Sequence, residues 1–198
     1  MPLILPRRAL LVTTSLTALA LAGCSSPSTV GTEPTDDAAS ALLARHDLPT
    51  TDARAVIDAL EALPLEEKPS GLLASIGTEE LTLAEEDGRE ATLPLPAEQV
   101  YLAVAPYVES THECFLHSLT TCTGELAGQE VQVRVSDGGA RPLIDEARTT
   151  AANGFLGLWL PRDRTLTLTL GTEAGEVSAT HRTLASAATC LTTMQLPG

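Results

Sequence analysis

Short apolar segments separated by turn residues fill the second half of the chain, and they constrain its fold more than any other feature. Within each segment apolar and polar side chains alternate, which is typical of β-strands that bury one face. Turn residues such as Asp137-Gly138-Gly139 and Asn153-Gly154 lie between the segments. Several short strands with this punctuation predict an antiparallel β-sandwich. We expect its strands at residues 100–108, 130–136, 142–150, 155–161, 165–171, 176–183 and 190–196.

Helical periodicity precedes the strands. One helix is expected to begin at Asp52 and to end before Pro64, which cannot continue it. Its apolar residues share a single stripe: Val56, Ile57, Leu60 and Leu63. A shorter helix that contains Leu42 and Leu43 is expected before Pro49.

A β-hairpin is expected between the helices and the sandwich. Residues 81–96 alternate apolar and polar around Asp87-Gly88, a tight-turn dipeptide. The apolar share of the chain, 43%, is sufficient for a core. The predicted fold class is therefore α+β, with N-terminal helices and a hairpin over residues 38–99 and a β-sandwich over residues 100–198. The rhythm of residues 149–170 also resembles the transthyretin-like or carboxypeptidase-regulatory sandwich, an analogy that says nothing of function.

The start of the chain has the features of an export signal. Arg7-Arg8 is followed by an apolar run, residues 9–22, that is shorter than a membrane-spanning helix requires. We therefore expect residues 1–23 to be a signal peptide. The two arginines leave open whether the general secretory route or the twin-arginine route exports the protein.

A cysteine follows the expected signal peptide directly. Leu21-Ala22-Gly23-Cys24 resembles the lipobox of bacterial lipoproteins, which implies cleavage before Cys24 and lipidation of its thiol. An ordinary signal peptide with an incidental cysteine is the alternative. Residues 24–37 are small and polar and include prolines, so they are expected to form a flexible tether.

Charge and motif content exclude several classes of function. The formal net charge of −14 makes nucleic acid an unsuitable electrostatic partner. The sequence has no serine-nucleophile elbow, phosphate-binding glycine loop or HExxH helix, and we predict no catalytic residues. The paired acids Glu79-Glu80 and Glu85-Glu86 are expected on the solvated face of the hairpin.

Thiols and imidazoles are concentrated in one short stretch, THECFLHSLTTC. It contains His112, Cys114, His117 and Cys122, and Cys190 lies far along the chain. If Cys24 is lipidated, three thiols remain in an oxidising compartment. One intramolecular disulfide would use two of them and leave the third unpaired. An intermolecular bridge, a buried inert thiol or a three-thiolate metal site would explain the odd number, and the nearby histidines favour the metal site. A plain Cys114–Cys122 disulfide with solvated histidines is the alternative.

The ligand types narrow the choice of metal. Thiolates and imidazoles suit copper and zinc, and thiolates favour Cu(I) in particular. A dithiol can also give electrons to Cu(II), so such cysteines serve either as ligands or as a redox couple. His46, near the end of a helix, is expected to have a capping or solvated role. His181, in a strand, is expected to lie away from the site, and its approach to the site is the alternative.

Three separated blocks resemble the CueP family of exported bacterial copper-binding proteins. They are YLAVAPYVESTHECFLHSLTTCTGEL, NGFLGLWLPRD and TCLTTMQL, within residues 64–196. The resemblance implies copper binding in the cell envelope and a part in copper tolerance. It carries the site over to Cys114, Cys122 and Cys190, with His112 or His117 completing or gating it.

These observations combine into one expectation with two rivals. We expect an exported protein, anchored to the cell membrane through lipidated Cys24, that sequesters or transfers Cu(I). The rivals are a thiol-redox protein that reduces Cu(II) with disulfide exchange, and a structural β-domain with one disulfide and a bystander thiol. Partners beyond copper and the lipid bilayer would be thiol–disulfide oxidoreductases or a copper-receiving protein, and a homodimer is left open.

Overall fold

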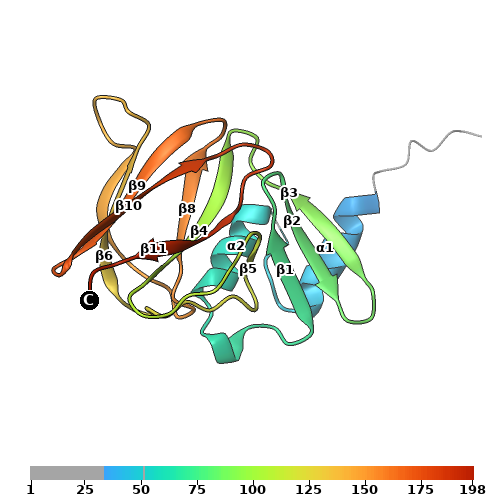
Figure 1. Ribbon diagram of the computed structural model, residues 1–198. Coiled ribbons are helices and arrows are strands. Elements are labelled where there is room, and N and C mark those ends of the chain that lie inside the picture. The colour runs from blue at the N-terminus through green and yellow to red at the C-terminus, as the bar shows by residue number, and fades with distance from the viewer. Residues whose placement is uncertain (1–33, 51) are drawn as a thin grey trace, which may run out of the picture. The chain divides into compact units, whose positions relative to one another are not determined.

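Two helices, a single-turn 3-10 helix and eleven strands follow one another along residues 34–50 and 52–198, the residues that the computed structural model describes (Figure 1). The predicted signal peptide, Cys24 and most of the predicted tether lie outside the described residues. No helix in this described part has both the length and the apolar character that crossing a membrane requires.

The helices are α1 (Pro34–Arg45), α2 (Ala53–Ala62) and η1 (Leu65–Glu67). The strands are β1 (Leu72–Ile76), β2 (Glu80–Glu85), β3 (Glu90–Pro94), β4 (Gln99–Tyr107), β5 (His117–Ser118), β6 (Glu130–Ser136), β7 (Ile144–Thr149), β8 (Leu156–Pro161), β9 (Thr165–Thr172), β10 (Gly175–Arg182) and β11 (Cys190–Gln195). They form three sheets, ordered β3-β2-β1-β5, β10-β9-β6-β7 and β11-β4-β8. The α+β class predicted from the sequence is confirmed.

The helix α2 follows from its local sequence. The Asp52 carboxylate accepts a hydrogen bond from the backbone N–H of Ala55 at 2.8 Å, which satisfies one of the free donors of the first turn. Val56, Ile57 and Leu60 are fully buried, so the predicted stripe faces the core. The helix thus presents a single apolar side to the first sheet and leaves its flanks free for polar contacts.

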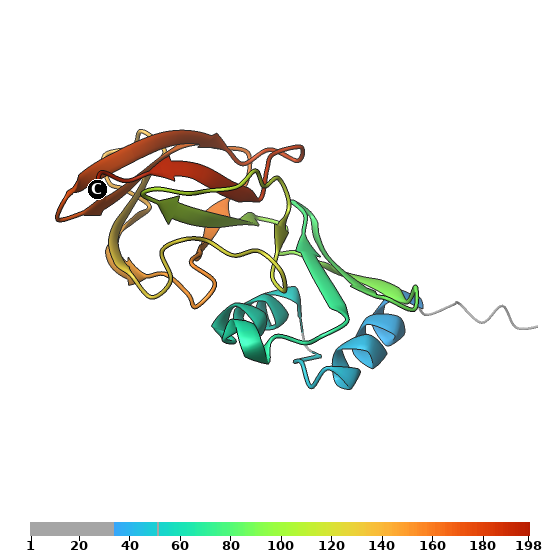
Figure 2. The same cartoon turned by 60° about the horizontal axis from the view of Figure 1, so that its bottom comes forward.

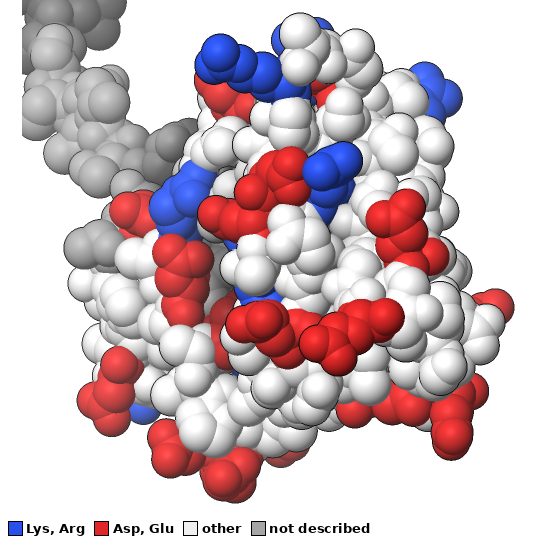
Figure 3. Space-filling model, turned by 90° about the vertical axis from the view of Figure 1, so that its left-hand side faces the viewer, with Lys and Arg blue, Asp and Glu red and all other residues white. Residues whose placement is uncertain are grey.

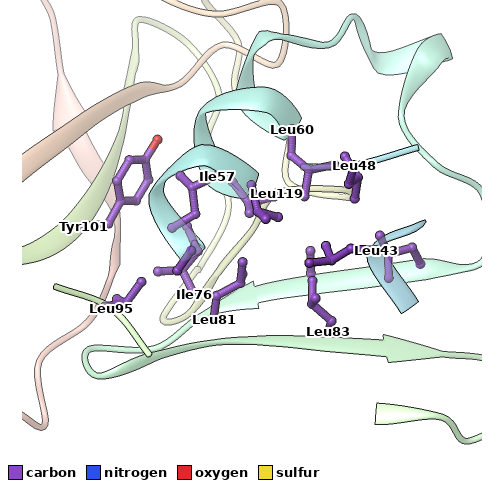
Figure 4. Packing of buried hydrophobic residues seen from close by; sticks show 14 of the residues in the cluster. Leu43, Leu48, Ile57, Leu60, Ile76, Leu81, Leu83, Leu95, Tyr101 and Leu119 are labelled. Atoms are coloured by element: carbon purple, nitrogen blue, oxygen red, sulfur yellow. The ribbon is translucent and has the colours of Figure 1, made fainter. Parts of the chain in front are cut away.

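The first sheet and the two helices enclose one core. Leucines and isoleucines of α2, β1 and β2 gather there with Leu43 of α1 and Leu119, as Figure 4 shows. The predicted hairpin is β2-β3, and α1 lies against β3. Figure 2 shows both helices on the same side of these strands.

The second core lies between the other two sheets. Inward-facing Val and Leu side chains of β6 and β9 pack against those of β4 and β8, as the alternating pattern predicted. Strand β4 is buried on both faces: Val100, Leu102 and Val104 enter this core, whereas Tyr101 and Ala103 enter the first. A strand that serves two cores must be apolar throughout, which explains the unbroken run of residues 100–108.

One strand pairing differs from the antiparallel arrangement expected for the sandwich. Strand β11 runs parallel to β4, with Cys190 opposite Ala103 and Leu191 opposite Val104. Its predecessor β10 belongs to the other sheet, so the chain crosses between sheets before it pairs. This crossing lets β11 enter beside β4 in the same direction rather than return as a hairpin partner.

The cysteine-rich segment packs against the first core. Strand β5, two residues long, pairs with the edge of β1, so that His117 lies opposite Ile76 and Ser118 opposite Ser75. Cys114 and Cys122 pack against the first core, and Cys190 is part of it. The described residues belong to one compact unit, and the domain boundary expected between residues 99 and 100 remains a prediction.

Candidate metal centre

The three cysteines of the described part meet in space. Cys114 and Cys190, 76 positions apart in the sequence, form a disulfide with their Cα atoms 5.6 Å apart. Cys122 is a free thiol, and its Sγ lies 3.7 Å from Sγ of Cys114. The plain Cys114–Cys122 disulfide considered from the sequence is not formed, because Cys190 occupies the bridging position.

Both predicted histidines lie beside these sulfurs. A ring nitrogen of His117 and the sulfurs of Cys122 and Cys190 all lie within 4.8 Å of one another. The same holds for His112 with Cys114 and Cys122. The two imidazoles differ in exposure, since His117 is completely buried and His112 is exposed. One histidine therefore faces the interior side of the sulfurs and the other faces the surface.

Hydroxyl groups of Thr192 in β11 and of Thr189, just before β11, hold the cysteine-rich segment in place. The Thr189 hydroxyl accepts a hydrogen bond from the backbone N–H of His117 at 3.1 Å and donates to the Ile76 carbonyl at 2.6 Å. The Thr192 hydroxyl donates to the His112 carbonyl at 2.7 Å. The two threonines that flank Cys190 and Leu191 thus fix the backbone of both histidines.

The chain before His112 is fastened by a carboxylate. Glu125 accepts hydrogen bonds from the backbone N–H groups of Val108, Glu109 and Ser110. These donors keep the pKa of Glu125 below its ordinary value despite some desolvation. The loop that presents His112 is therefore fixed close to its anchor on β4.

A largely buried carboxylate completes the inner side of the centre. Glu61, near the end of α2, accepts a hydrogen bond from Nε2 of His117 at 2.7 Å. Its carboxylate also accepts from the Tyr101 hydroxyl at 3.2 Å and from the Asn153 amide at 3.0 Å. The other ring nitrogen of His117, Nδ1, is buried and has no hydrogen-bond partner.

The protonation states of this group are coupled. Burial opposes ionisation of Glu61, but the hydrogen bond and charge of His117, together with Lys68 and Asn153, hold its pKa below the ordinary value. Burial likewise disfavours the charged form of His117, yet Cys122 and Glu61 raise its pKa above the ordinary value. Burial also opposes the thiolate of Cys122, but His117 and the Ser118 backbone N–H lower its pKa. The surroundings therefore shift Cys122 towards the thiolate, which is the form that binds metals.

An open hollow gives solvent access to the centre. It is lined by side chains of the segment before β5 and of β11, including Tyr107, His112, Cys114 and Phe115. Phe155 is fully buried and packs against both imidazoles, with ring centroids 4.6 Å from His117 and 6.4 Å from His112. The sulfurs therefore lie between the solvent-accessible hollow and the buried ring of Phe155.

The structure brings together all five predicted ligands, Cys114, Cys122, Cys190, His112 and His117. His181 belongs to neither cluster of potential metal ligands among the described residues, and His46 instead contacts Glu85 at 2.8 Å.

The expectation that Glu85 belongs to a solvated face was wrong. Glu85 contacts the guanidinium groups of Arg45 and Arg89 as well as His46. Hydrogen bonds from the two arginines lower the pKa of its carboxyl to about 2. These residues tie the hairpin to the end of α1, which is a structural role.

Sequence reasoning missed Glu61. It follows Ile57 by four residues, which places a carboxylate at the margin of the apolar stripe of α2. That position is a usable signal, because a carboxylate beside a buried stripe requires partners. Asn153 was interpreted only as a turn residue, although its side chain also reaches Glu61.

Comparison with known proteins agrees with the geometry. The family model described as "Periplasmic copper-binding protein CueP" matches residues 55–195. A crystal structure described as S.CueP superposes with a TM-score of 0.73 at 34% sequence identity, covering 79% of this chain and 96% of that one. No curated protein sequence matches the chain.

Proposed function

The chain belongs to the CueP family of periplasmic copper-binding proteins, and from this premise we propose that its reduced form binds Cu(I) through Cys114, Cys122 and Cys190 together with His117. The convergence of three sulfurs on a buried imidazole is the observation that carries the proposal. Thiolates are the ligands that Cu(I) prefers. The unpartnered Nδ1 of His117 supports the choice of this histidine, because a buried polar atom without a partner is costly unless something occupies it.

His112 has a different part in the proposal. It is exposed and lines the hollow that leads to Cys114. A copper ion that arrives from solvent reaches His112 before it reaches the buried histidine. We assign His112 to capture of the ion, while His117 and the thiolates retain it.

The redox state of the cysteines controls this site. A disulfide between Cys114 and Cys190 leaves Cys122 as the one free thiol beside His117. Reduction restores two further thiolates within reach of the same position. The oxidised protein is therefore the weak binder and the reduced protein the strong one.

The disulfide also favours a second function, the reduction of Cu(II). Two thiolates can give one electron each to two Cu(II) ions, which yields two Cu(I) ions and the Cys114–Cys190 bond. Cys122 and His117 then remain to hold one Cu(I). Repeated turnover needs a thiol–disulfide oxidoreductase to return two electrons to the disulfide.

Location follows from the family and from the leader. The family is periplasmic, so the protein is exported. Lipidation of Cys24, motivated by Leu21-Ala22-Gly23-Cys24, would anchor it to the membrane through the tether. Anchored in this way, it would keep copper near the membrane for sequestration or for transfer to a receiving protein.

Competition for Cu(I) tests the proposal. The fully reduced protein should take Cu(I) from a colour-forming chelator and should prefer it to Zn(II) under the same conditions. His117→Ala should weaken binding most and His112→Ala less, whereas His46→Ala, the matched control, should bind like the wild type. A preference for zinc, or equal losses from all three variants, would refute the proposed site. Binding of neither metal would favour the structural β-domain.

A further inference from the structure

Three hydrogen-bond donors from three different elements converge on the carboxylate of Glu61. His117 comes from β5, Tyr101 from β4, and Asn153 from the turn before β8. The Glu61 side chain is only 14% exposed, so water does not compete freely for it. Such a set of partners holds the carboxylate in one position relative to the imidazole.

The surrounding backbone makes room for this arrangement. A Cβ atom at Gly157 would occupy the space of the Tyr101 hydroxyl. Gly154 has a φ of +80°, and a Cβ there would lie 2.5 Å from the Gly124 carbonyl oxygen, so the turn that carries Asn153 closes tightly against the loop after Cys122. The amide of Asn153 is itself oriented, because its Oδ1 accepts the backbone N–H of Phe155 at 3.1 Å.

This geometry determines which ring nitrogen of His117 remains available. A carboxylate only accepts hydrogen bonds, so Nε2 must carry the proton that it shares with Glu61. In a neutral imidazole the lone pair then resides on Nδ1. Nδ1 is the buried nitrogen that has no partner, on a ring that lies against the sulfurs of Cys122 and Cys190.

We propose that Glu61 is the positioning residue of the centre: it fixes the Nε2-protonated tautomer and the ring orientation of His117, so that Nδ1 is presented to copper. The inference rests on the proposed function, since it assigns His117 as a ligand. Carboxylates that orient metal-bound histidines in this way typically contribute about 10–100-fold to metal affinity.

A purely structural role for Glu61 predicts something different. Replacement would then change stability but would leave the tautomer of His117 and the copper affinity of the folded protein unchanged. Glu61→Gln separates the two roles, because it keeps the side-chain volume. Its single carbonyl oxygen cannot serve His117, Tyr101 and Asn153 together, and its NH₂ group would face another donor.

The test combines nitrogen NMR of the His117 ring with Cu(I) competition on the reduced protein. In the wild type without copper, at a pH high enough for the ring to be neutral, the proton should reside on Nε2. In Glu61→Gln the tautomers should mix, and Cu(I) affinity should fall about 10–100-fold. Asp58→Asn, which removes an exposed carboxylate from the same helix, should change neither measurement. Thermal unfolding of each variant identifies any that fail to fold.

The outcomes distinguish this inference from the proposed function. A wild-type tautomer and wild-type Cu(I) affinity in Glu61→Gln, combined with a weakened His117→Ala, would overturn the positioning role alone. If His117→Ala itself binds Cu(I) like the wild type, then histidine ligation fails and the inference fails with it. Loss of affinity together with a changed tautomer in Glu61→Gln, but not in Asp58→Asn, supports the inference.

Discussion

Reduction of the Cys114–Cys190 disulfide should destabilise the protein, and Cu(I) should restore the lost stability. The disulfide closes a loop of 76 residues by sequence separation. Chain entropy for a loop of this length gives about 15 cal/mol/K, or about 4.5 kcal/mol at 25 °C, as the expected loss of unfolding free energy on reduction. Typical domains have unfolding free energies of about 5–15 kcal/mol, so this loss is large enough to measure readily.

Copper should compensate because it would join the same residues that the disulfide joins. A ligand that binds only the folded state adds about 4 kcal/mol when its free concentration is about 1,000 times its dissociation constant. Urea unfolding of the oxidised protein, the reduced protein and the reduced protein with buffered Cu(I) measures all three free energies. The third value should return close to the first.

Cys122→Ser is the matched control for this experiment. It leaves the Cys114–Cys190 disulfide intact, so the difference between oxidised and reduced protein should persist. It removes one proposed ligand, so the recovery with Cu(I) should be much smaller. Equal recovery in the variant and the wild type would refute a three-thiolate site. If the oxidised and reduced proteins had equal stability, the reasoning that this disulfide stabilises the fold by closing a long loop would be refuted.

Three further predictions concern redox chemistry, pH and location. Cu(II) added to the fully reduced protein should yield Cu(I), trapped by a coloured chelator, and a Cys114–Cys190 disulfide found by mass spectrometry; Cu(I) without a new disulfide would contradict the redox function. In the folded protein the pKa of the Glu85 carboxyl is lowered to about 2 from an ordinary 4.5. The ionised carboxylate therefore stabilises the folded state at pH values above its ordinary pKa, and this contribution is lost as the pH falls towards 2. Thermal unfolding across that range should therefore show a smaller loss of stability for Glu85→Gln than for the wild type, and identical profiles would show that the carboxylate has no such role. Cys24→Ala should release the protein from membranes, and unchanged fractionation would rule out a lipid anchor at this position.

The fold was largely predictable because its elements carry regular patterns. Strands β6 and β9 alternate so strictly that their predicted limits, 130–136 and 165–171, match the observed ones to within one residue. Strand β5 was not predicted, since two residues cannot display a period. Its pairing with β1 depends on contacts between segments that the sequence does not link.

The sequence predicted which cysteines and histidines lie close together, but not how they are arranged. Residue chemistry alone selected the cysteines and the two nearby histidines. The partner of Cys114 could not be chosen from spacing, because Cys190 is brought to it by the parallel pairing of β11 with β4. Glu61 was not predicted for a related reason. The role of a single carboxylate on a helix can be inferred only when its partners from other elements are known.

At the proposed site, selectivity for copper would come from the sulfurs rather than from the charge of the protein. On the face shown in Figure 3, Asp and Glu side chains are more widespread than Lys and Arg, in line with the formal net charge of −14. Such a surface raises the local concentration of every cation, and salt screens its field within about 8 Å at physiological ionic strength. Calcium and magnesium, which prefer oxygen ligands, gain nothing from thiolates beside an imidazole, whereas Cu(I) does. The acidic surface can therefore increase the rate at which copper arrives, but at the proposed site the buried histidine and the cysteines would determine which metal remains bound.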